Sequence, residues 1–329
     1  MSRAFDCRTS HAEPSSVGRP RVLYASDLSS RSEGSLQAAA LLANRVEGQL
    51  TIGHILPPRA TSLLRTNARK RLRQHASAAP LRARSVVAFA IRSGSVSKTV
   101  AELATETDAG MIVMGCQRRR PLAALFGTTA ERVVSLAARP ALIVNAKGTL
   151  RYDKLVIAAD PADIVMHLVH LADRWRLLDV PKISIVHPFR PMGPLFAERH
   201  ETLMAHRHME RWKGATRTRL LEGLGAAGFD PSRFDVRIEE AYPCSVVRRV
   251  LRGAGFALLV LGSTTQVFGR AIRPSLANDA LLTLDCDILL NATNARAYRY
   301  DGRTFVSDRV GDRDTPLAVP ATKLTGIGT

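Results

Sequence analysis

The chain has 329 residues, of which 46% are hydrophobic. This length fits two ordinary domains of roughly 100–200 residues each, and the apolar content excludes a chain that is disordered throughout. No apolar run approaches the roughly 18 residues of a membrane span, so we expect no membrane association and a cytoplasmic protein. The net charge of +18 is uneven, because residues 1–149 hold 22 Lys and Arg against 9 Asp and Glu. The positive electrostatic field of these residues attracts polyanions in general, which predicts weak nonspecific polyanion binding.

Residues 1–19 are polar, contain Pro and Gly, and lack the apolar core of a secretory signal, which predicts a flexible N-terminal extension. The four cysteines, Cys7, Cys116, Cys244 and Cys286, lie at no metal-ligand spacing from each other or from histidine. We therefore expect reduced thiols and no metal site of cysteine and histidine.

An internal repeat organises the chain. Residues 21–27 form an apolar segment that ends in Asp27, and residues 154–160 repeat it 133 positions later. Residues 50–54 and 183–187 match at the same offset, and each ends in His. Two matches at one offset predict two copies of one domain.

The copies continue beyond these strands. Residues 111–115 match 258–262 at an offset of 147, and residues 141–145 resemble 287–291. The second copy is longer because of a polar stretch at 189–237. We predict domain 1 at 20–148, a degenerate domain 2 at 152–294, and a C-terminal tail without a sustained period at 295–329, loose or draped on the surface.

Helical spacing of apolar residues separates the predicted strands. It is seen in three groups: Leu36, Ala39, Ala40 and Ala43; Val100, Leu103 and Ala104; and Val247, Val250 and Leu251. Apolar strands alternating with helices predict a parallel sheet that is buried on both faces. Each copy is therefore expected to be an open α/β sheet of Rossmann-like type, with ligands at the carboxyl ends of its strands.

The arrangement resembles the universal stress protein family. That family shows a strand ending in Asp, a strand ending in His-Val, and a later strand feeding the pattern Gly, two residues, Gly, nine residues, Gly, Ser/Thr. The first copy offers Asp27, His54-Ile55, Gly115, and the blocks 126–133 and 139–144. The resemblance covers about residues 20–146 well and residues 152–292 more weakly.

The resemblance implies an adenine nucleotide alpha hydrolase-like fold, with two tandem domains packed as a pseudo-dimer through their last strands at 141–144 and 288–290. It also implies ATP as a candidate ligand of domain 1, with Mg if bound. In that reading Asp27 lies near the ribose or the metal-bound phosphates, and Ile55 reads adenine through its backbone. The small residues of the loop would meet the phosphates, and Arg118 could attract them by charge. The phosphate-loop candidates are Gly115, Gly127, Thr128 and Thr129, with Arg118 beside them.

Both copies depart from the family pattern. In the first copy Arg118 replaces the second Gly, and the loop before Gly127 is one residue short. In the second copy Thr265 and Pro274 replace glycines, and Pro188 follows His187 where the family uses a backbone contact. Since proline has no N–H, the second copy loses donors for a nucleotide.

Each candidate residue also has a structural interpretation. Asp27 is a good cap for the helix that follows it, and His54 and His187 suit packed positions. Gly115 suits the turn after its strand, and Cys116 suits an unreactive thiol. The basic run 65–73 is expected to form a solvated helix face, with a nucleic-acid contact as the alternative.

Three functions remain open from the sequence. The first is a stress protein that acts through protein partners, with or without a nucleotide. The second is an ATP-hydrolysing enzyme, against which stands the lack of a GxxxxGK[ST] or GxSxG motif or paired carboxylates. The third is a basic nucleic-acid-associated protein, although aromatic residues for base stacking are only 5% of the chain.

Overall fold

The computed structural model describes residues 19–29, 32–77, 79–80, 87–116, 129–145, 148–159, 164–189, 199–241, 243–263, 280–281, 283–292, 298–300 and 305–307. We call residues 19–145 the first half and residues 148–292 the second half. The described helices include none that is long and apolar enough to cross a membrane.

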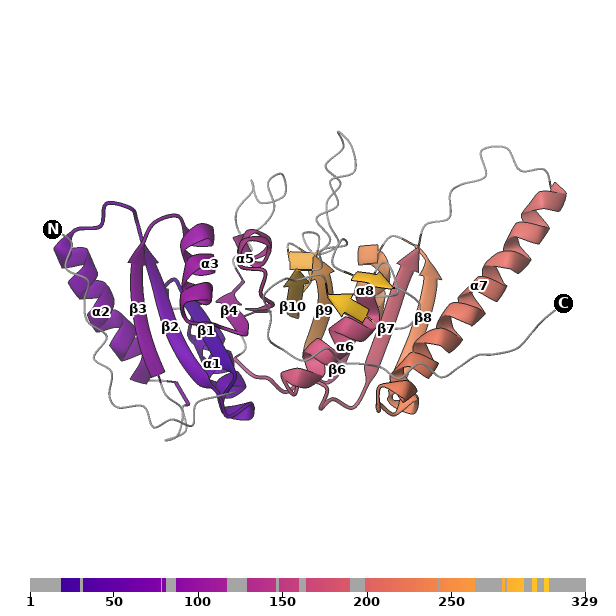
Figure 1. Ribbon diagram of the computed structural model, residues 1–329, viewed down its shortest axis with the longest axis horizontal. Coiled ribbons are helices and arrows are strands. Elements are labelled where there is room, and N and C mark those ends of the chain that lie inside the picture. Colours follow the sequence, from indigo (N-terminus) through magenta and orange to yellow (C-terminus); the bar gives the residue numbers. More distant parts are fainter. Residues whose placement is uncertain are drawn as a thin grey trace.

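The first half is a five-stranded parallel sheet with helices between its strands (Figure 1). Its strands lie in the order β3-β2-β1-β4-β5. The strands are β1 (Arg21–Ser26), β2 (Gln49–Leu56), β3 (Val87–Ser93), β4 (Met111–Gly115) and β5 (Ala141–Val144), and the helices are α1 (Glu33–Arg45), α2 (Ser62–Ser77), α3 (Val96–Glu106) and α5 (Thr129–Ala137).

The second half has the same connectivity, because its strands lie in the order β8-β7-β6-β9-β10. The described residues of the matched sequence segments lie on strands, or directly after them, at equivalent places in this order. The strands are β6 (Lys154–Ala158), β7 (Ile183–Phe189), β8 (Phe234–Glu240), β9 (Ala257–Ser263) and β10 (Asp287–Ala292), and the helices are α6 (Val165–Arg174), α7 (Arg199–Ala226), the 3-10 turn η3 (Pro231–Arg233) and α8 (Pro243–Leu251). The polar stretch that lengthens this half contains the 28-residue helix α7.

One antiparallel pairing joins the two halves into a single ten-stranded open sheet. Ile143, Leu142 and Ala141 of β5 pair with Ile288, Leu289 and Leu290 of β10. All other pairings within this sheet are parallel. The α/β class and the open, mostly parallel sheet predicted from the sequence are confirmed.

Alternating strand residues enter two apolar clusters on opposite faces of the sheet. Val22 and Tyr24 of β1 belong to one cluster, with residues of α1, α2, α6 and α7, while Leu23 belongs to the other, with α3, α5 and α8. Both clusters contain strand residues of both halves. The helical spacings found in the sequence are also confirmed, since Leu36, Val100 and Val247 are all buried.

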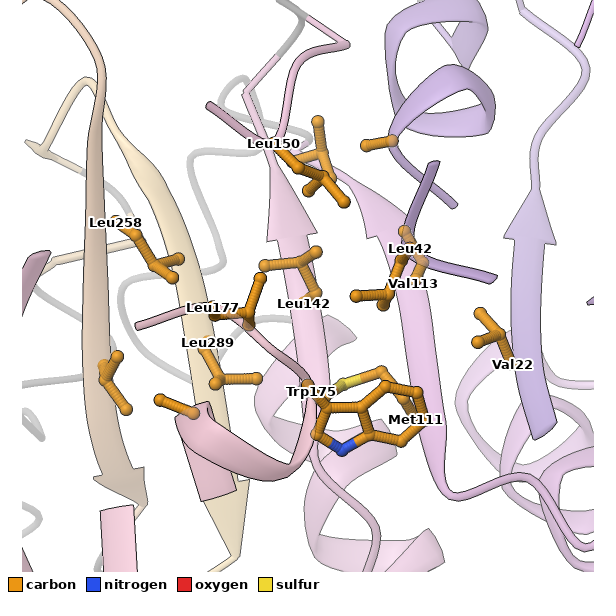
Figure 2. Packing of buried hydrophobic residues seen from close by; sticks show 14 of the residues in the cluster. Val22, Leu42, Met111, Val113, Leu142, Leu150, Trp175, Leu177, Leu258 and Leu289 are labelled. Atoms are coloured by element: carbon orange, nitrogen blue, oxygen red, sulfur yellow. The ribbon is translucent and has the colours of Figure 1, made fainter. Parts of the chain in front are cut away.

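Trp175, which ends α6 in the second half, packs into the first half (Figure 2). Its indole is only 3% exposed and lies beside Met111 of β4. A Cβ added to Gly110 would stand 3.2 Å from the indole, so a glycine at that position allows the ring to approach. Leu177, Leu142 and Leu289 continue the same cluster across the β5–β10 junction.

Polar contacts also cross the junction. Arg45, the last residue of α1, donates to the carbonyl of Arg176, and Arg176 donates to the carbonyl of Arg45, each at 3.0 Å. These guanidinium groups satisfy carbonyls at the two helix ends. In addition, Asp287 of β10 accepts from the backbone N–H of Asn145 at 2.7 Å and from the hydroxyl of Tyr152 at 2.9 Å. Burial, followed by the Asp287 carboxylate, raises the pKa of Tyr152 well above its ordinary value, which keeps the hydroxyl a donor.

The C-terminal region, predicted as a tail that is loose or draped on the surface, contains two short strands. Residues 298–300 form β11 (Tyr298–Tyr300) and residues 305–307 form β12 (Phe305–Ser307), which pair antiparallel as a separate two-stranded sheet. Each strand has only three residues, too few for alternation to stand out in the sequence.

The two tryptophans of the chain give a matched test of the packing between the halves. Trp175→Ala is expected to lower the free energy of unfolding by about 3–5 kcal/mol, because it removes a buried ring that packs between the two halves. Trp212 is 42% exposed, so Trp212→Ala should cost about 1 kcal/mol or less. Urea denaturation of both variants measures the difference, and equal losses would contradict the packing described.

Candidate functional site

The carboxyl ends of β1, β2 and β4 meet at one edge of the first half. The last β1–β2 pair is Ser26 with His54, and the last β1–β4 pair is Ala25 with Met114. Asp27, Ile55 and Gly115 are the next residues on the three strands, so they lie at nearly one level. The chain leaves β1 for β2 on one side, while β4 pairs on the other side, which makes this the switch point of the sheet.

Asp27 begins the loop after β1, where its side chain forms a local turn. Its Oδ1 accepts from the backbone N–H of Ser29 at 2.9 Å. The N-cap of α1 is Ser32, which makes no side-chain capping hydrogen bond. The interpretation of Asp27 as the cap of this helix is therefore wrong, because the helix begins six residues after Asp27. The Asp27 side chain is exposed at the carboxyl edge.

His54 fixes the end of β2 to the end of β1. Its Nδ1 donates to the carbonyl of Ser26 at 2.8 Å. The β1 ladder stops at this level, whereas β2 continues along β3 through the pairs Ile55–Arg92 and Leu56–Ser93. His54 is half-buried, and Ile55 lies beyond its last β1 neighbour.

Gly115 ends β4 directly against the first turn of α1. A Cβ added there would stand 3.2 Å from Oγ of Ser35. That contact is tighter than most real Cβ contacts, so Gly115 serves close packing between strand and helix. Cys116 follows, half-buried, with its Sγ 3.9 Å from the carbonyl of Leu281 in the second half.

Tyr24 holds the start of α1 in place, and the sequence analysis missed this role. Its hydroxyl donates to the carbonyl of Ser32 at 2.8 Å and lies 3.1 Å from Oγ of Ser35. Burial raises the pKa of Tyr24, with Asp27 adding to it, against the lowering by its hydroxyl neighbours. A tyrosine within an apolar strand is the available signal, since a buried phenol needs a polar partner.

Charged groups from two helices surround the loop after β1. Arg71 of α2 donates from Nη2 to the carbonyl of Leu28 at 2.8 Å. His75 lies near it, and burial lowers the pKa of His75 although Glu33 and Asp27 oppose that shift. Among the described residues, the edge therefore carries the exposed carboxylates of Asp27 and Glu33 and the guanidinium of Arg71. No sequence signal links Arg71 to Leu28, because 43 residues separate them.

The remaining predicted residues divide into two groups. Thr129 begins α5 and is half-buried. Arg118, Gly127 and Thr128 lie outside the described residues, as does Asp160 of the second copy. The structure thus brings together Asp27, Ile55 and Gly115. Among the described residues there is no group of three side chains able to hold a metal ion.

At the equivalent edge of the second half, a histidine makes the same hydrogen bond to a carbonyl at a strand end, but the neighbouring side chains differ. Nδ1 of His187 donates to the carbonyl of Ala159 at 2.9 Å, 133 positions after the His54–Ser26 bond. His187 is only 4% exposed, and the ring of Trp212 from α7 lies 5.9 Å from its ring. Pro188 is inside β7, paired with Glu239. His167 of α6 accepts a hydrogen bond at Nε2 from Nδ2 of Asn291 at 2.7 Å.

Acid should destabilise the second half through His167. Burial lowers its pKa, and His170 adds to the lowering. The unfolded chain then binds the proton more readily, so this stability is present above about pH 6.5 and is lost as the pH falls below that value. Protonation also removes the acceptor that Asn291 uses. Thermal melting at about pH 7.5 and pH 5.5 should show a smaller acid loss for His167→Gln than for the wild type.

His208→Gln, at an exposed position of α7, controls for the removal of a histidine. It should retain the acid loss of the wild type. The assignment to His167 is wrong when His167→Gln and His208→Gln have the same acid loss.

Comparison with known proteins gives a family match for the first half and a shared fold for most of the chain. Residues 18–145 match the sequence model of the universal stress protein family. A universal stress protein from Archaeoglobus fulgidus is similar in structure, with a TM-score of 0.57, 14% identity, and coverage of 84% of this chain and 97% of that one. No curated protein matched the chain.

Two proteins from Pseudomonas aeruginosa are also similar in structure. One is a functionally unknown protein with a TM-score of 0.56 and 17% identity, covered over 94% of its length. The other is a putative universal stress protein with a TM-score of 0.54 and 18% identity, also covered over 94% of its length. Each match covers 84% of this chain. At sequence identities this low, the structural similarity shows a shared fold and nothing more.

Proposed function

Because residues 18–145 of this chain belong to the universal stress protein family, we propose that the protein acts in the stress response through protein partners and binds Mg-ATP at the carboxyl edge of the first half. The proposal of nucleotide binding rests on one observation, which is that Asp27, Ile55 and Gly115 lie together at the switch point of the sheet. Open α/β sheets bind ligands in this position.

The start of α1 favours an anion at this edge. A helix N-terminus directs unpaired backbone N–H groups and a partial positive charge outward. Ser32 and Ser35 are fixed by Tyr24, and Ser35 packs on Gly115, so the helix start is held next to the end of β4. Fixed donors bind without the cost of ordering them first.

The carboxylates at the same edge favour a nucleotide that carries magnesium. Asp27 is exposed directly after β1 and Glu33 is exposed in the first turn of α1, so two negative groups lie around the loop. They would repel bare phosphates, whereas Mg²⁺ prefers oxygen ligands from one or two carboxylates and from phosphates. We assign Asp27 to the ribose or the metal-bound phosphates, and the backbone at Ile55 to the adenine.

We propose binding without turnover. The sequence has no GxxxxGK[ST] phosphate loop and no GxSxG nucleophile motif. A bound nucleotide would act through the surface that it presents with α1 and the loop after β1, which partner proteins then recognise. The second half would contribute the junction strand β10 and no nucleotide, since Pro188 lacks an N–H and Trp212 covers His187.

Asp27→Ala should abolish stabilisation by Mg-ATP. At a ligand concentration about 100 times Kd, binding contributes about 2.7 kcal/mol and is expected to raise Tm of the wild type by about 4 °C, because a chain of 329 residues has an unfolding entropy of about 0.7 kcal/mol/K. Thermal melting with and without Mg-ATP measures this shift, and the nucleotide content of freshly purified protein gives an independent reading.

Asp230→Ala is the matched control. Asp230 is another exposed aspartate whose Oδ1 accepts from the backbone N–H two residues later, also at 2.9 Å, but it lies beside η3 in the second half. It should retain the full shift. Absence of any shift in the wild type, or an equal loss in both variants, would contradict the site.

A further inference from the structure

Helix α2 carries a strongly positive surface. It contains Arg65, Arg69, Lys70, Arg71 and Arg73 and no Asp or Glu. The helix attaches to the sheet by Ala68, Leu72 and Ala76, which are buried at four-residue spacing, while all five basic residues are exposed. Within the described parts of the chain, no carboxylate forms an ion pair with Arg65, Lys70 or Arg73. α2 lies at the outer end of the first half, away from the junction (Figure 1).

The second half shows that this charge does not follow from the fold. α7 has the same place in the chain order, between the second and third strands of its half. It mixes six Lys and Arg with three Glu over 28 residues, and Lys213 pairs with Glu210 at 2.7 Å. The equivalent helices therefore differ in charge pattern, and the unbalanced charge is particular to α2.

The chemistry of the exposed face favours phosphate over a protein or a membrane. From Arg69 to Gln74 the only apolar side chain is Leu72, which is buried. A protein interface needs an apolar core, and a helix lying in a lipid surface needs an apolar stripe along its length. The stripe of α2 is already packed on the sheet. Leu63 and Leu64, 68% and 41% exposed, are confined to its first turn.

A nucleic-acid backbone requires only cations at suitable spacing. Lys and Arg neutralise phosphates and release counterions, and the guanidinium fork matches phosphate oxygens. Arg65 and Arg73 are eight residues apart, which is about 12 Å along the helix axis, with Lys70 between them. The net charge of +18, concentrated in residues 1–149, would attract a polyanion to this half.

We propose that α2 docks on the phosphate backbone of a nucleic-acid duplex through Arg65, Lys70 and Arg73. The docking set contains none of the residues assigned to the nucleotide. Arg71 is excluded from the docking set because its Nη2 donates to Leu28 of the loop after β1. Binding through phosphates carries no base readout, so it is insensitive to sequence and sensitive to salt.

The test compares two triple variants on mixed-sequence duplex DNA over a salt series. The first is Arg65→Gln with Lys70→Gln and Arg73→Gln. The matched control is Arg207→Gln with Arg217→Gln and Arg219→Gln, which removes three exposed charges from α7. Each phosphate contact contributes about 0.9 to the steepness with which log K falls against log salt. The slope of the α2 variant should therefore be shallower than that of the wild type by about 2–3, and the slope of the control should change much less.

A charge-preserving variant, Arg65→Lys with Arg73→Lys, should retain the wild-type slope, and thermal melting should show all variants folded. Phosphatidylserine vesicles and polyglutamate serve as competing anionic probes. The proposal is overturned when the wild type does not bind the duplex at low salt, when both triple variants lose slope equally, or when the α2 charges are needed for vesicles or polyglutamate but not for duplex DNA.

Discussion

The antiparallel pairing of β5 with β10 is the contact on which the whole arrangement depends. Only three residue pairs form it, yet it makes one sheet out of two sets of parallel strands. The apolar clusters on both faces then continue from one half into the other. Trp175 fills the space between the halves, and the reciprocal Arg45 and Arg176 contacts close the adjoining helix ends. Since neither edge of the junction is exposed, each half covers a strand that would otherwise invite aggregation.

The two halves keep the same frame and differ at the surfaces that could bind a ligand. In both, a histidine at the end of the second strand donates to a carbonyl at the end of the first. In the first half this histidine–carbonyl hydrogen bond lies beside an exposed aspartate and the fixed start of α1. In the second half it is covered by Trp212, and Asn291 contacts His167 nearby. Function therefore separates from fold within one chain, because both halves keep the histidine–carbonyl bond at the strand ends while the side chains around it differ.

The fold was predictable from local patterns because buried parallel strands leave continuous apolar runs. The repeated segments at 21–27 and 154–160 mark the central strands, and Leu36 and Val100 mark helices that pack on them. The interpretation of Asp27 as a helix cap failed because sequence cannot fix where a loop ends and a helix begins. Tyr24 and Arg71 were missed because their partners, Ser32, Ser35 and Leu28, are chosen by tertiary packing.

The sequence by itself determined the α/β class, the matched segments with their strand-end histidines, and the basic run of α2, since each is visible within a short segment. Only the tertiary structure decided that ten strands form one sheet, that Asp27, Ile55 and Gly115 meet at one level, and that Trp175 reaches the other half. Those facts depend on strand register and on contacts between residues far apart in the chain, which apolar pattern alone leaves open.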